Sequence, residues 1–137
     1  MNDIERKEVK EAIDAADNAL THLGNARAYL NSAGNWGILD VLGGNTITWL
    51  FKHGKMSKAE REIDEAKRAL ERLNRELKDV KGCSSIHIDE FLTIADVFLD
   101  GFIVDLWVQS KISDAKKQCD EAIRQVESIR SRLLSIR

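Results

Sequence analysis

The amino-acid sequence predicts an all-α protein, an antiparallel bundle of three long helices with coiled-coil-like heptad packing. The 137 residues include no proline, the residue that most strongly interrupts helices, and charged residues make up 32% of the chain. Apolar residues recur over two long stretches at alternating steps of three and four positions, the spacing of one helix face. The length fits a single helical domain over residues 1–137.

The first predicted helix covers about residues 3–32. Asn2 and Glu5 have the spacing of a capping box, with Asn2 as the N-cap, and Gly34 is well placed to end the helix. Arg27 interrupts its apolar stripe. The stripe consists of Ile13, Ala16, Leu20, Leu23 and Leu30. Small side chains widen the stripe, so that a neighbouring helix could approach closely: Ala12, Ala19, Ala26 and Ala33.

A junction over residues 33–44 holds four of the eight glycines and predicts a tight reversal of the chain. The second predicted helix covers about residues 45–80, with a kink or a new helix start at Gly54 and Ser57. Its a and d heptad positions are Met56, Ala59, Ile63, Ala66, Leu70, Leu73, Leu77 and Val80. We expect a loop over residues 81–86, with Gly82 ending the helix.

The third predicted helix covers about residues 87–136. Its C-terminal half repeats the heptad pattern with Ile112, Ala115, Cys119, Ala122, Val126, Ile129, Leu133 and Ile136. A helix of about 50 residues would be about 75 Å long, too long for a compact domain. We therefore expect it to bend near residues 109–113, or to overhang and pair with another chain. If the kinks are breaks, the bundle has four or five helices.

The two heptad stretches resemble each other at a shift of 56 residues, which aligns identical residues between 40–71 and 96–127. One interpretation is an internal duplication, which predicts pseudo-twofold packing of the second helix against the end of the third. The other is that two helices in one heptad register share alanines, leucines and charges.

A distinctive motif lies at the junction. It comprises Ser32-Ala33-Gly34-Asn35-Trp36-Gly37, then Asp40, Gly43-Gly44 and Lys52-His53. It resembles the pattern SAxNWGxxDxxGGG, followed by KH and a charged helix, of a family of small uncharacterised bacterial helical proteins. Asn45 stands in place of the third glycine. The resemblance covers roughly residues 19–70; it implies a helical fold and a bacterial origin, and no chemistry.

Composition narrows the functional classes. The net charge is -2 and the pI about 5.9, so no electrostatic argument favours nucleic acid as a partner. The most apolar stretch, residues 91–108, contains Asp96, Asp100 and Asp105, which disfavour membrane spanning. The polar N-terminus has no signal-peptide core, and two cysteines make no disulfide framework. We expect a cytoplasmic protein with no nucleic-acid or membrane partner.

The junction is the first candidate site, with Trp36, Asp40, Gly43 and Gly44. Its structural interpretation is a helix–helix corner that Trp36 plugs. Its functional interpretation is a small pocket, or an anion site on the amides at the start of the second helix.

Charged and reactive residues supply further candidates. Asp96 and Asp100 share a helix face in an apolar segment. They require a partner such as Lys52, His53 or Arg27, or a bound cation. His22 and His53 could meet beside the junction, and Cys83 lies four residues before His87. No spacing specifies a metal, cofactor or catalytic site, so we predict none of these.

The apolar segment also predicts an interface. One chain offers only two other helices to cover a helix that is apolar all round, so we expect part of it to stay exposed and to form a homodimer. The other interpretation is full coverage by the first helix and the junction. The candidate interface residues are Phe91, Phe98, Phe102, Leu106 and Trp107. The sequence thus favours a non-enzymatic interaction or scaffold protein. The alternative is a helical bundle that binds a small ligand or metal near the junction and Asp96/Asp100.

Overall fold

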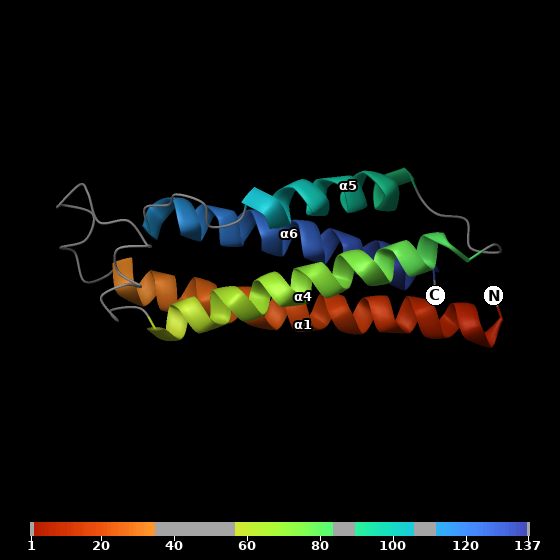
Figure 1. Ribbon diagram of the computed structural model, residues 1–137, viewed down its shortest axis with the longest axis horizontal. Coiled ribbons are helices and arrows are strands. Elements are labelled where there is room, and N and C mark those ends of the chain that lie inside the picture. The colour runs from red at the N-terminus through yellow and green to blue at the C-terminus, as the bar shows by residue number, and fades with distance from the viewer. Residues whose placement is uncertain (1, 35–56, 84–89, 106–111, 137) are drawn as a thin grey trace.

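The computed structural model describes residues 2–34, 57–83, 90–105 and 112–136. They form the helices α1 (Asp3–Gly34), α4 (Ser57–Lys81), α5 (Glu90–Asp105) and α6 (Ile112–Ile136), with no strand among the described residues. Each described helix runs opposite to the one before it (Figure 1). The all-α bundle predicted from the sequence is confirmed.

The arrangement of the helices leaves one end of the bundle thicker than the other. α1 packs along both α4 and α6, while α5 packs on α4 and α6. α5 covers only the half of the bundle that holds the start of α1 and the ends of α4 and α6 (Figure 1). The outer sides of α1 and α6 therefore meet in a face that α5 does not cover.

The segment expected to form one long helix over about residues 87–136 forms two antiparallel helices instead. α5 ends at Asp105, and α6 begins at Ile112 and runs in the opposite direction (Figure 1). The physical reason is burial: folding back places Leu92, Ala95 and Leu99 of α5 in the common core. A straight helix would have left these side chains without a partner in the chain.

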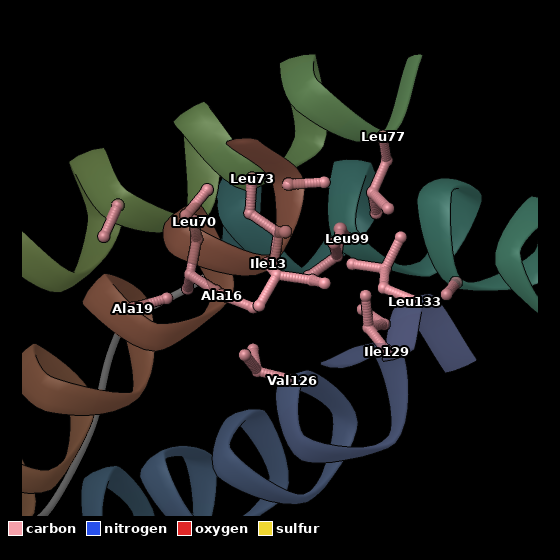
Figure 2. Close-up of a cluster of buried hydrophobic side chains, with 14 of the residues drawn as sticks. Ile13, Ala16, Ala19, Leu70, Leu73, Leu77, Leu99, Val126, Ile129 and Leu133 are labelled. Atoms are coloured by element: carbon pink, nitrogen blue, oxygen red, sulfur yellow. The ribbon is translucent and has the colours of Figure 1, made fainter. Parts of the chain in front are cut away.

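The core forms where the heptad stripes of α4 and α6 face inward. Its largest buried side chains include Leu70, Leu73, Leu77, Ile129 and Leu133. Figure 2 shows leucines of α4 pointing toward Ile13 of α1, Leu99 of α5 and the aliphatic residues of α6. Burial of each leucine stabilises the fold by roughly 1.5–3 kcal/mol. The predicted heptad faces are confirmed wherever the structure describes them.

Helix α1 lies between two neighbours because its side chains are small. Five alanines on it are buried: Ala12, Ala15, Ala16, Ala19 and Ala26. Oδ1 of Asn2 accepts a hydrogen bond from the amide of Glu5 at 2.8 Å, which confirms the predicted N-cap. Gly82 follows the last residue of α4, as expected, and its amide donates to the carbonyl of Lys78 at 3.0 Å.

The 56-residue similarity corresponds to equal burial in α4 and α6. Leu70 and its counterpart Val126 are both buried, as are Leu77 and Leu133. The two helices nevertheless pack mainly against α1 and α5 rather than against each other. Direct pseudo-twofold packing of α4 on α6, which the duplication hypothesis predicts, is therefore wrong for the described residues. The two stripes face a common core instead of each other.

None of the described helices combines the length and the apolar character that a membrane span requires.

Candidate functional site

Most of the residues proposed for the junction site fall outside the described ranges. These are Trp36, Asp40, Gly43, Gly44, Lys52 and His53. The interface candidates Leu106 and Trp107 lie outside as well, and so does His87. Asp96, Asp100, Phe98 and Phe102 lie within α5, but only their backbone is described. The roles suggested for these residues stay predictions.

Phe91 is the interface candidate whose side chain the structure describes. It is half-buried against the core, and the guanidinium carbon of Arg132 lies 5.2 Å from its ring centroid. This cation–π contact ties α5 to the end of α6. The outer side of α5 is open at Ile94, which is 62% exposed, and at Gly101. Phe91 thus stabilises the single chain, while Ile94 faces outward.

Two ion pairs cross the outer face between α1 and α6. Nε of Arg27 on α1 lies 2.8 Å from Oδ1 of Asp120 on α6. Arg130 on α6 pairs in the same way with Asp17 on α1. Arg27 was expected only to interrupt the stripe of α1, or to meet an aspartate of α5. The antiparallel register instead brings it to α6.

A groove begins between these ion pairs and extends past the Asp17–Arg130 pair, and we call it the α1–α6 groove. It has a volume of about 580 Å³ and is lined by Asp17, Leu20, Gly24, Ile123, Glu127, Arg130, Ser131 and Leu134. Leu134 is 39% exposed, and Leu20 and Ile123 are half-buried. A Cβ atom added to Gly24 would meet no atom within 4 Å, so the groove is open at this position.

A second hollow borders this groove along α6. Its volume is about 730 Å³, and it shares Ile123 with the α1–α6 groove and reaches Asp120. The described lining is mostly charged, with Lys117, Glu121 and Arg124 on the rim. The aliphatic side chains Leu20 and Leu134 therefore line the α1–α6 groove but not the second hollow.

An acidic cluster forms where the start of α1 meets the end of α4. Carboxylate oxygens of Glu8, Glu76 and Asp79 lie within 4.8 Å of one another. The Oε2 atoms of Glu8 and Glu76 are buried and receive no hydrogen bond from the described residues. Burial raises the pKa of Glu76, and the charges of Glu11 and Asp79 raise it further.

Oxygen ligands of this kind suit hard cations. Asp79 is exposed, however, and Glu8 and Glu76 are only partly buried, and such groups of carboxylates are common without an ion. Partial burial and the neighbouring carboxylates favour the protonated form of the Glu76 side chain. Sequence reasoning missed the cluster, because only the register of α1 against α4 brings Glu8 to Glu76.

The two cysteines are poor nucleophiles. Cys119 is fully buried in α6, and burial together with Asp120 raises the pKa of its thiol to about 12. Cys83 follows α4, and burial, then the charges of Glu5 and Glu8, raise the pKa of its thiol. A thiolate is the reactive form, so neither cysteine is activated.

His22 bonds to an acidic residue of the neighbouring helix. Its Nδ1 atom lies 2.7 Å from Oε2 of Glu62 on α4, and both side chains are half-buried. Nδ2 of Asn25 lies 3.5 Å from the same oxygen. This group joins α1 to α4.

Comparison of the chain with models of protein families, with curated proteins and with solved structures found no match. The similarity of residues 19–70 to a bacterial family therefore stays a prediction.

Proposed function

We propose that the protein is a non-enzymatic interaction protein that works as a homodimer. The observation that supports this function is the α1–α6 groove, in which Leu20, Ile123 and Leu134 gather on one face. Single exposed aliphatic side chains are ordinary on a protein surface. Several that line one concave face beside charged and polar residues are typical of surfaces that bind another protein.

The charges of the described helices favour a protein partner over nucleic acid. The net charge of the chain is -2, and the ion pairs of the α1–α6 face each join an acidic to a basic residue. A phosphate backbone would require an excess of basic residues on one face. A mixed, locally neutral face suits a second protein surface with the same balance.

Light scattering over a wide concentration series tests the proposal. A monomer has a mass of 15.5 kDa, and we expect twice that mass at the higher concentrations, falling toward the monomer on dilution. A mass that stays at the monomer value over the whole series would contradict self-association.

The alternative, a small ligand or metal bound near the junction and Asp96/Asp100, rests on residues whose side chains the structure does not describe. Metal analysis of protein purified without chelator tests this alternative. Stoichiometric metal that is lost on substituting Asp96 and Asp100 by Asn would favour it over the interaction protein.

A further inference from the structure

We propose that the α1–α6 groove binds the same groove of a second copy of the chain, around a twofold axis. The inference rests on the proposed homodimer and specifies which surface forms it. A twofold interface uses one patch on both subunits, so the patch must be complementary to itself. Both the charges and the side-chain sizes of the α1–α6 face satisfy this requirement.

The charges make the face complementary to itself because the two ion pairs have opposite orientations, with the acidic residue on α1 in one pair and on α6 in the other. Arg27 lies ten residues after Asp17 on α1, and Asp120 lies ten residues before Arg130 on α6. Because α1 and α6 are antiparallel, the two ion pairs lie at two levels along the helix axes. At one level α1 carries the aspartate and α6 the arginine, and at the other level α1 carries the arginine and α6 the aspartate. A face-to-face copy then places each aspartate opposite an arginine.

Two twofold axes give this result. An axis parallel to the helices places Asp17 opposite the partner's Arg130. An axis across the helices, in the plane of the interface, places Asp17 opposite the partner's Arg27. In either case charges of opposite sign meet at both levels, which favours the correct register and disfavours shifted ones.

The side chains between the ion pairs are also complementary in size. In the antiparallel register Gly24 lies level with Ile123. The axis parallel to the helices therefore places Ile123 opposite the partner's Gly24. The axis across the helices places Leu20 opposite the partner's Gly24. The position above Gly24 has no atom within 4 Å of an added Cβ, so it can accept a branched side chain. Close packing of this kind is what stable interfaces require.

The outer side of α5 is the competing surface, because Ile94 is exposed there. The two crossed ion pairs that specify a register belong to the α1–α6 face and not to the described residues of α5. It does provide a matched control. Gly101, like Gly24, is an exposed helical glycine with no atom within 4 Å of an added Cβ.

Gly24→Glu and Gly101→Glu therefore form the first test. Glutamate has a higher helix propensity than glycine, so each variant should retain the circular dichroism spectrum and thermal stability of the parent monomer. A buried, unpaired charge weakens an interface strongly. We expect Gly24→Glu to weaken the dimer at least about tenfold by light scattering, and Gly101→Glu to leave its dissociation constant unchanged.

The possible outcomes separate the inference from the proposed function. If Gly101→Glu dissociates the dimer and Gly24→Glu does not, the protein is a homodimer that uses α5, and the inference is wrong. If both variants keep the parental dissociation constant, the inference is equally wrong. If the unaltered chain is a monomer throughout, the proposed function fails with it.

A mixing experiment tests the charge pattern itself. Asp17→Arg and Arg130→Asp each break the ion pair within the chain, and each brings like charges together in its own dimer. When the two variants are mixed, a dimer with one subunit of each places opposite charges against each other, if the axis is parallel to the helices. Asp17→Arg mixed with Arg27→Asp does the same if the axis lies across them.

Recovery of the dimer in one of the two mixtures would support the inference, because the pair within each chain stays broken in the mixture. If one variant carries an isotope label, native mass spectrometry distinguishes mixed dimers from dimers of a single variant by their mass. If neither mixture associates more tightly than its separate components while the unaltered chain dimerises, the proposed charge complementarity is overturned.

Discussion

Nδ1 of His22 lies 2.7 Å from Oε2 of Glu62, which joins the middle of α1 to the start of α4. The two residues are forty positions apart in the sequence, so their contact reports the register of the two helices. Because both side chains are half-buried, their interaction is partly screened by solvent.

The first prediction is that His22 and Glu62 are energetically coupled. A double-mutant cycle with His22→Ala and Glu62→Ala should give a coupling of about 0.5–1 kcal/mol in urea unfolding. As a control, the cycle of His22→Ala with Glu65→Ala should give none, because Glu65 pairs with Arg68 on the outside of α4. Equal coupling in both cycles would contradict the register described for α1 and α4.

A second prediction concerns the docking of α5. Leu99 is 1% exposed, whereas Ile94 on the same helix is 62% exposed. Leu99→Ala should lower the free energy of unfolding by about 2–5 kcal/mol, because it leaves a cavity between α5 and the other helices. Ile94→Ala should change it by less than about 0.5 kcal/mol. A small effect of Leu99→Ala would show that α5 does not share the common core.

The third prediction follows from the raised pKa of Glu76. The unfolded carboxyl titrates near its usual value of 4.5, and the folded one at higher pH. The folded state therefore binds the proton more tightly, and this group favours folding increasingly as the pH falls through its folded pKa toward 4.5. At neutral pH the ionised side chain disfavours folding, because it is partly buried and lies near the carboxylates of Glu11 and Asp79.

Glu76→Gln should accordingly stabilise the protein at pH 7 by about 0.5 kcal/mol, a modest value because solvent reaches the group. The gain should shrink as the pH is lowered to 4.5, as measured by urea unfolding of both proteins at each pH. Glu65→Gln, outside the cluster, should show no such trend. A gain that is independent of pH would argue against a raised pKa at Glu76.

A fourth prediction concerns the buried thiol. With its pKa raised to about 12, Cys119 holds almost no thiolate at pH 8. Iodoacetamide should therefore leave Cys119 unmodified in the folded protein and label it after unfolding in urea, as peptide mass spectrometry can show. Labelling of Cys119 at equal rates in both states would mean that this part of α6 is not packed as described.

The sequence predicted the helices and their buried faces well where the pattern is periodic. Leu70, Leu73 and Leu77 follow the heptad spacing, and all three are buried. Asn2 was recognised as an N-cap from its spacing to Glu5. These features are local, because the helical repeat alone decides which side chains share a face.

The reversal between α5 and α6 was not predicted as a separation into two antiparallel helices. The segment around it is apolar on nearly every face, so its hydrophobic pattern shows no periodic change that would indicate the end of a helix. No proline or glycine stands between Asp105 and Ile112 to mark one either. The sequence therefore suggested a bend near residues 109–113, an overhanging helix or, if the bend is a break, an additional helix, and it did not decide among them.

By itself, then, the sequence determined that this protein is helical and which side chains turn inward. Only the tertiary structure decided which helices are neighbours and at what register. The pairing of Asp17 with Arg130, and the meeting of Glu8 with Glu76, depend on that register. The physical reason is that helix periodicity acts over a few residues, whereas register follows from the combined packing of all the helices around one core.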